Sequence, residues 1–154
     1  MGSAAPSNDP LGVGLDVGQR APDFSIRLLD GSTVTLSSLR GRPVWLNFWA
    51  SSCDACVTEM PFIERLYEER RGSGLAVVGI SVESPAPDAV GLARALGVTY
   101  TLGFDRDGSI TRLYRVALLP AQFWIDRAGV IRDWALGEVP PEVMAADVAK
   151  IVGR

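Results

Sequence analysis

Both cysteines of this 154-residue chain stand in one stretch, residues 43–61, which reads PVWLNFWASSCDACVTEMP. Val44 to Ala50 is an apolar run broken only by Asn47, a pattern typical of a strand buried on both faces of a sheet. From about Cys53, apolar residues recur every three or four positions with charged residues between them, which predicts a helix. The sequence therefore places both cysteines at the start of a helix that follows a buried strand.

The spacing of the two cysteines suits reversible disulfide chemistry. A helix N-terminus favours a thiolate, because unpaired backbone N–H groups and the positive end of the helix dipole meet there, so Cys53 is the predicted reactive sulfur. Cys56 lies one turn deeper on the same face, with its Cα about 5 Å away, within the disulfide range. A bridge closing so short a loop would add only roughly 2 kcal/mol of stability, which favours a redox role. A zinc site would need ligands from elsewhere, because the chain has no His and no further Cys.

This stretch resembles the active-site segment of thioredoxin-like proteins, most closely the TlpA/ResA-like group, with AhpC/TSA-type redoxins as further relatives. Other motifs of the group are also present in the expected order: APDF at 21–24 and Asp-Gly at 30–31 before this stretch, and PxxFxIDxxG at 120–129 after it. The resemblance covers about residues 18–152. It implies an α/β thioredoxin-like fold, in which helices flank a central mixed sheet, with an N-terminal β-hairpin and a strand-helix insertion. The chain departs from the group at Ser52, where a Trp is usual, and at Asp54-Ala55, which lacks the frequent Pro.

The remaining patterns alternate strand and helix, which points to parallel neighbours in the sheet. Further strands are expected at 24–29, 33–36, 75–82, 100–104, 122–126 and 130–135. Further helices are expected at 88–96, 110–114 and 142–152. The turns at 30–31 and 127–129 predict two hairpins.

Length and composition indicate a single thioredoxin-like domain at residues 18–154, since 47% hydrophobic residues suffice for a sizeable core. Residues 1–17 are interpreted as a flexible lead, either a cloning remnant or what is left of a membrane anchor. No stretch has the pattern of a transmembrane helix or a signal peptide, so neither is expected. The net charge of −3, without a basic block, argues against nucleic acid as a partner.

Glu59 is the third candidate catalytic residue. It lies one turn after Cys56, and a carboxyl in apolar surroundings has a raised pKa, so it could exchange a proton with the Cys56 thiol. The resemblance associates the matching Glu with proton handling, and Asn47 stands where cytoplasmic thioredoxins keep a buried Asp. The alternative is a solvated helix glutamate.

The predicted substrate-binding residues are Trp49, Leu119 and Pro120. The resemblance implies that the Leu119-Pro120 peptide is cis and faces the disulfide, which leaves the backbone of Leu119 free to pair with an extended substrate segment. Trp49, together with Leu118 and Leu119, would give a protein partner an apolar contact, although Trp49 fits the core equally well.

These residues predict a thiol–disulfide oxidoreductase in which Cys53 attacks a substrate disulfide and Cys56 resolves the mixed disulfide. No metal is expected, and no cofactor beyond the Cys53–Cys56 dithiol. The resemblance implies reduction of protein disulfides in exported proteins such as apocytochrome c, as in cytochrome c biogenesis, with electrons from a membrane thiol reductase of the DsbD/CcdA type. We expect an extracytoplasmic monomer; a cytoplasmic paralogue is the alternative.

Two other functions stay open. A thiol peroxidase shares the fold, but its Pro-x-x-x-Thr/Ser-x-x-Cys motif would need a hydroxyl at Ala50 and Pro at Leu46. A Cu(I)-handling assembly factor or metallochaperone could hold the metal between the two thiolates, although the absence of His weighs against it. Insulin reduction, peroxide consumption and Cu(I) titration would separate the three.

Overall fold

The computed structural model describes residues 11–83 and 87–153. In those residues the strands are β1 (Ser25–Leu28), β2 (Thr33–Thr35), β3 (Val44–Trp49), β4 (Ala76–Ser81), β5 (Thr101–Phe104), β6 (Ala121–Ile125) and β7 (Ile131–Leu136). The α-helices are α1 (Asp54–Arg70), α2 (Pro87–Ala95), α3 (Ser109–Leu113) and α4 (Pro141–Val152), and short 3₁₀ segments lie at Leu36–Leu39 and Arg71–Ser73. The ends of the expected strands and helices agree with these bounds to within about one residue.

The described strands form one mixed sheet in the order β2-β1-β5-β4-β3-β6-β7. β4 pairs in parallel with both β3 and β5, and this confirms the expected parallel neighbours. The β1–β2 and β6–β7 hairpins are antiparallel, as predicted, and β6 pairs antiparallel with β3. β3 and β4 are therefore central strands, which explains their continuous apolar sequences.

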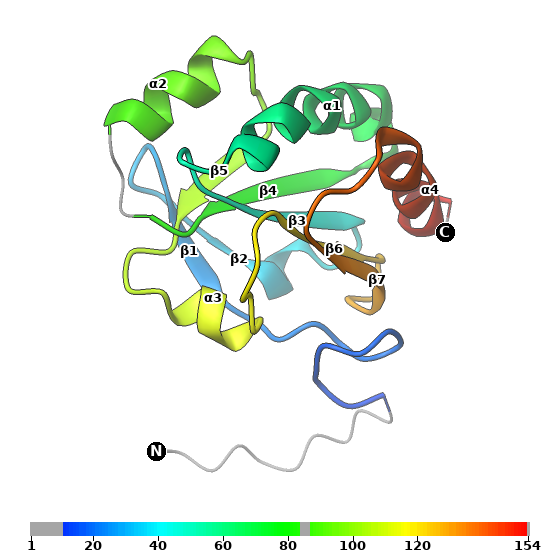
Figure 1. The fold of residues 1–154 in the computed structure, drawn as a ribbon. Helices are drawn as coiled ribbons and strands as arrows, with labels where there is room; N and C mark the ends of the chain where they lie inside the picture. The colour runs from blue at the N-terminus through cyan, green and yellow to red at the C-terminus, as the bar shows by residue number, and fades with distance from the viewer. Residues whose placement is uncertain (1–10, 84–86, 154) are drawn as a thin grey trace.

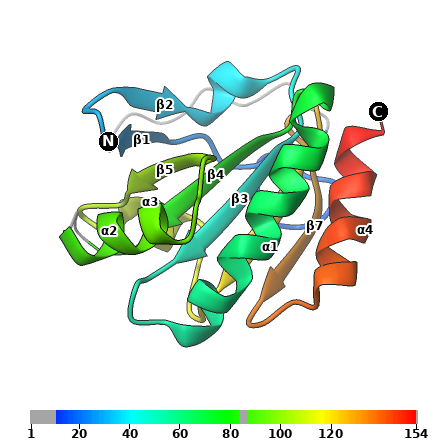
Figure 2. The ribbon, with the colours of Figure 1, turned by 90° about the horizontal axis from the view of Figure 1, so that it is seen from above.

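Helices cover both faces of the sheet (Figure 1), with α1, α2 and α4 on one side and α3 on the other. Because successive residues of a strand point to opposite faces, β3 contributes to both layers. Trp45 packs with side chains of α1 and α4, whereas Leu46 and Phe48 pack with Ile110 of α3. Seen from above, α1 and α4 lie side by side (Figure 2), and they contact each other. Asn47, Trp49 and the even-numbered residues of β6 thus lie under α1.

Residues 11–17, which composition assigns to the flexible lead, turn back against the domain. The Gly14 N–H donates to the Arg20 carbonyl at 3.0 Å, and the Arg20 N–H donates to the Gly12 carbonyl at 2.9 Å. Leu15 packs against the core on the α3 side. The second half of the expected lead is therefore held by hydrogen bonds and packing, while residues 1–10 lie outside the described residues. No described helix is long and apolar enough to cross a membrane.

Candidate active site

Cys53 and Cys56 form a disulfide at the start of α1, with Cα atoms 5.2 Å apart. Cys53 is the N-cap residue, and its Sγ accepts a hydrogen bond from the Cys56 backbone N–H at 3.2 Å. This donor would also face a Cys53 thiolate, and a helix N-terminus stabilises negative charge. Cys53 is half-buried, but Cys56 is only 1% exposed. One sulfur can therefore be reached from outside while the other is enclosed.

The loop that leads into α1 is fixed by two hydrogen bonds. The Cys53 N–H donates to the Ala50 carbonyl at 3.1 Å, which closes a turn. The Ser51 N–H donates to the Glu83 carboxylate at 2.6 Å. Glu83 follows β4, the parallel neighbour of β3, so the carboxyl ends of both central strands hold the reactive loop. The sequence analysis did not single out Glu83, although a carboxylate just after a buried apolar strand was the available signal.

Trp49 lies beneath the disulfide and not at the surface. It is 1% exposed and belongs to a buried cluster that also contains Cys56, Met60 and Phe104. The role proposed for it as a substrate contact does not fit this position, because both faces of the central strand β3 are covered. The alternative, that Trp49 is a core residue, is the one observed.

The Leu119-Pro120 peptide is cis, as the resemblance implies. Leu119 is half-buried and, like Cys53, packs against the buried cluster that contains Trp49 and Cys56. Pro120 is buried, while Leu118 is 54% exposed. Leu118 thus gives this segment an exposed apolar side chain, and a pairing of Leu119 with substrate stays a prediction.

Glu59 is buried, with 5% of its surface exposed, so it is not a solvated helix glutamate. Its Oε1 accepts from the Val139 backbone N–H at 2.7 Å, and its Oε2 accepts from Gln122 Nε2 at 3.0 Å. Burial raises the pKa of Glu59 to about 7, and the nearby Glu138 adds to this, while the two donors act in the opposite sense. The carboxyl therefore titrates near neutral pH, as a group that moves protons at that pH must.

The Glu59 side chain lines a groove of about 330 Å³ between α1 and the segment that precedes α4. The lining residues are Ala55, Thr58, Glu59, Phe62, Glu138, Val139, Pro140 and Pro141. The groove gives the buried carboxyl a route to solvent on the side of α1 away from α2.

Gln122 is a site residue that sequence reasoning missed. It is fully buried on β6, where it pairs in register with Asn47 of β3, and its Oε1 accepts from Trp45 Nε1 at 2.6 Å. Asn47 is also buried, but its Oδ1 has no hydrogen-bond partner among the described residues. The polar residue that meets Glu59 is thus on β6 and not on β3. The sequence feature that could have identified Gln122 was an amide in an otherwise apolar strand, two residues after Pro120.

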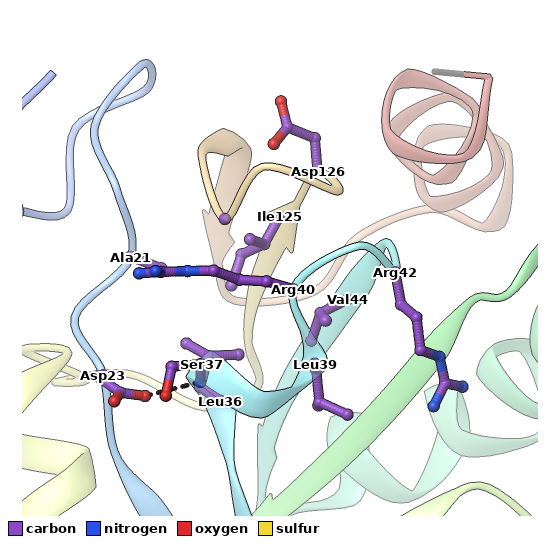
Figure 3. A pocket seen from close by; sticks show the side chains of 11 residues that line it. Ala21, Asp23, Leu36, Ser37, Leu39, Arg40, Arg42, Val44, Ile125 and Asp126 are labelled. Atoms are coloured by element: carbon purple, nitrogen blue, oxygen red, sulfur yellow. Dashed lines mark hydrogen bonds between the residues drawn. The ribbon is translucent and has the colours of Figure 1, made fainter. Parts of the chain in front are cut away.

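A second hollow lies at the opposite end of the sheet, between Arg40, Val44 and Asp126 (Figure 3). Its cavity volume of about 20 Å³ is room for about one water molecule. Since Val44 begins β3 and Cys53 follows its end, this pocket is separate from the cysteines. No three His, Cys, Asp or Glu side chains are gathered as possible metal ligands in the described ranges.

Comparison with known proteins agrees with this geometry. Residues 17–134 match the model of the AhpC/TSA family. The thiol-disulfide oxidoreductase ResA of Geobacillus kaustophilus (strain HTA426) is 33% identical over 126 residues, which cover 82% of this chain and 72% of the relative. ResA of Oceanobacillus iheyensis (strain HTE831) is 34% identical over 125 residues, which cover 79% and 65%.

A solved structure extends the agreement to the fold. The crystal structure of a thiol:disulfide interchange protein DsbE from Chlorobium tepidum superposes with a TM-score of 0.84 at 31% identity, and the match covers 91% of this chain and all of that one. The fold, the Cys53–Cys56 pair and these relatives point to one chemistry, thiol–disulfide exchange. The chain belongs to the AhpC/TSA family, and within it to the ResA-like thiol–disulfide oxidoreductases of thioredoxin-like fold.

Proposed function

We propose that this oxidoreductase reduces disulfides in exported proteins, with Cys53 as the nucleophile and Cys56 as the resolving thiol. The observation that carries the proposal is the asymmetry of the two sulfurs. Cys53 is half-buried, caps α1 and accepts the Cys56 N–H at 3.2 Å, whereas Cys56 is only 1% exposed. A substrate disulfide can therefore reach Cys53, whereas the buried Cys56 can react only with Cys53.

The reaction takes place in two exchange steps. The Cys53 thiolate attacks one sulfur of the substrate disulfide, a mixed disulfide forms, and the other substrate sulfur leaves as a thiolate. Cys56 then loses its proton and attacks Cys53 Sγ, which releases the second substrate thiolate. The substrate gains two electrons, and the protein is left with the Cys53–Cys56 disulfide. Protons from solvent complete the two substrate thiols.

In this proposal, Glu59 is the base that takes the proton of Cys56. It stands three positions further on α1, where side chains have Cβ atoms about 5 to 6 Å apart. Because its pKa is raised to about 7, its carboxylate can accept a proton near neutral pH and return it through the groove beside Val139. The alternative, a purely structural Glu59, would leave no pH signature in the exchange rates.

The substrate segment is proposed to bind over the cis peptide. Leu118, at 54% exposure, and the half-buried Leu119 would contact apolar side chains of the substrate, and the backbone of Leu119 would pair with its extended chain. Trp49 would act from below, by packing against Cys56.

Partners and location are proposed from the family. The relatives named above are thiol-disulfide oxidoreductases and a thiol:disulfide interchange protein. We extend this to a monomer that acts outside the cytoplasm on protein disulfides, apocytochrome c among them, and receives electrons from a membrane thiol reductase of the DsbD/CcdA type.

A trapping experiment tests the assignment of the two cysteines. Cys56→Ser should attack substrate but fail to release it, so mixed disulfides through Cys53 should accumulate on an apocytochrome c peptide carrying a disulfide. Cys53→Ser is the matched control and should trap nothing. If Cys53→Ser is the variant that traps, the roles are reversed. Peroxide consumption, or tight Cu(I) binding with no insulin reduction, would support one of the two other functions instead.

A further inference from the structure

The contacts of Glu59 continue into a chain of hydrogen bonds with a fixed direction. Trp45 Nε1 donates to Gln122 Oε1 at 2.6 Å, and Gln122 Nε2 donates to Glu59 Oε2 at 3.0 Å. The three residues come from β3, β6 and α1, and each is buried. The chain therefore connects the middle of the sheet to the carboxyl that we place next to Cys56.

Trp45 decides which end of the Gln122 amide faces Glu59. An indole N–H can only donate, so it needs the carbonyl end of the amide as its acceptor. A reversed amide would set two donors against each other at Trp45, and a buried donor without an acceptor costs free energy. Gln122 is thereby held with its NH₂ group toward Glu59.

This orientation distinguishes the two protonation states of the carboxyl. An ionised carboxylate only accepts, and it satisfies both the Gln122 amide and the Val139 N–H at 2.7 Å. A protonated carboxyl has a hydrogen to donate, but Gln122 presents no acceptor to it while Trp45 occupies the carbonyl end. The network thus favours the carboxylate, against the burial that raises the pKa of Glu59 to about 7.

We propose that Trp45 and Gln122 are positioning residues that act on the reaction through Glu59, by presenting it with donors only and so holding down its affinity for a proton. The inference rests on the proposed function, since it concerns the same carboxyl. Glu138, from the segment before α4, and Tyr100, from the segment before β5, interact electrostatically with Glu59, and Cys56 lies three positions earlier on α1. A test must therefore change the hydrogen bond and leave these groups in place.

Trp45→Phe removes the indole donor and keeps an aromatic ring in the core. The amide of Gln122 can then turn its carbonyl toward Glu59 and accept the proton of the neutral acid. Gln122→Met removes the donor to Glu59 directly, with a side chain of similar length. Both substitutions should raise the pKa of Glu59 by about 1 pH unit. Trp45→Phe lets Gln122 stabilise the neutral acid, and Gln122→Met removes a hydrogen bond to the charged form.

Trp124→Phe is a matched control. Trp124 pairs in register with Trp45, lies with its ring centre 5.7 Å away, and is equally buried. Its Nε1, however, has no hydrogen-bond partner in the described part of the chain. Trp124→Phe therefore changes the same kind of side chain in the same core without removing a hydrogen bond to Gln122.

The readout is the ¹³C NMR titration of the Glu59 carboxyl in the oxidised full chain, assigned by its absence in Glu59→Gln. The wild type should inflect near pH 7, Trp45→Phe and Gln122→Met about 1 pH unit higher, and Trp124→Phe at the wild-type position. Unchanged titrations in both Trp45→Phe and Gln122→Met would overturn the inference, as would equal shifts in Trp45→Phe and Trp124→Phe. If Trp45→Phe does not fold, Gln122→Met decides alone.

The exchange rate separates this inference from the proposed function. The pH profile of mixed-disulfide resolution, measured on the same variants, should move together with the NMR titration. A shifted titration with an unchanged rate profile would confirm that Trp45 and Gln122 control the pKa of Glu59, but it would contradict the proposed role of Glu59 in the exchange reaction.

Discussion

Glu59 and Gln122 lie 63 positions apart in the chain, yet Gln122 Nε2 stands 3.0 Å from a carboxylate oxygen of Glu59. They meet because β6 pairs with β3 in the sheet, and α1 packs on the face of the sheet to which the even-numbered residues of β6 point. The contact places an ionisable group between two layers of the core. Its pKa, raised from 4.5 to about 7, should therefore affect stability as well as catalysis.

The stability of the oxidised protein should fall as the pH rises through 7. Between pH 4.5 and 7 the folded state holds a proton on Glu59 that the unfolded state has lost. The stability linked to this proton is fully present below pH 4.5 and is lost as the pH passes 7, by up to about 3 kcal/mol. Urea unfolding at pH values from 4 to 8 measures it.

Glu59→Gln isolates this contribution from the other titrating groups. The difference in unfolding free energy between wild type and variant should change with pH over the same window. The variant should also lose about 1 to 3 kcal/mol at pH 8, because two donors then face a side chain with a single acceptor. A difference that does not change with pH would show that Glu59 has the same pKa in the folded and unfolded states.

Resolution of the mixed disulfide should speed up as the pH rises through about 7. Only ionised Glu59 can take the Cys56 proton, and ionisation follows the raised pKa of this carboxyl. Glu59→Gln should abolish the inflection and slow the step by roughly 100-fold. Single-turnover product release from a preformed mixed disulfide on Cys53 is the measurement.

Glu64→Gln is the control for that experiment. Glu64 is also a buried glutamate of α1, but its carboxylate accepts from Thr99, at 2.7 Å from the backbone N–H and 2.6 Å from the hydroxyl. Its substitution should lower stability and keep the pH inflection. Loss of the inflection in both variants would point to a general disturbance of α1.

Much of this site could be predicted from the sequence, because local patterns determine it. The apolar run of β3 and the helical spacing after Cys53 place the cysteines at the start of α1, and the structure confirms this. The cis peptide at Leu119-Pro120 was predictable only from the family resemblance. Nothing in the composition of that segment distinguishes a cis from a trans bond.

The contacts of Glu59 could not be predicted, because they depend on register between distant segments. A one-residue shift of β6 against β3 would turn Gln122 away from α1 and bring a neighbour in its place. The position of Trp49 in the core likewise depends on helices covering both faces of β3. Residues 11–17 have a composition typical of a flexible segment. They are nevertheless held in place by backbone hydrogen bonds to Arg20 and by the packing of Leu15 against the core.

Gly79 is predicted to be intolerant of a side chain. A Cβ there would lie 2.7 Å from Leu102 Cδ2 and 3.1 Å from Tyr100 Cε1, under α1. Gly79→Ala should destabilise the protein by about 1 to 3 kcal/mol. Gly91, in α2, has open space around it, so Gly91→Ala should be neutral or stabilising by up to about 1 kcal/mol. Denaturant unfolding of both variants tests the contrast, and an unaffected Gly79→Ala would mean that β4 and β5 adjust freely.

The redox potential should be low, as in a reductase, because the Asp54 carboxylate opposes the stabilisation of the Cys53 thiolate by the helix N-terminus. Asp54 is the exposed first residue of α1, next to Cys53, whose sulfur accepts the Cys56 N–H at 3.2 Å. The helix N-terminus favours a thiolate, while the neighbouring carboxylate disfavours it by an amount that solvent screening keeps modest. A less stabilised thiolate means a less stabilised reduced form, so we expect a potential below about −200 mV.

Asp54→His should raise that potential by roughly 10 to 30 mV, because it removes a negative charge beside Cys53 and can add a positive one. Asp88→His is the matched control: Asp88 is an exposed acidic residue in the first turn of α2, where there is no cysteine, and its substitution should leave the potential unchanged. Equilibration of each protein with a dithiothreitol or glutathione couple gives the values. A wild-type potential near about −120 mV would contradict the reductase direction, because a protein that oxidising would form disulfides in its substrates and not remove them.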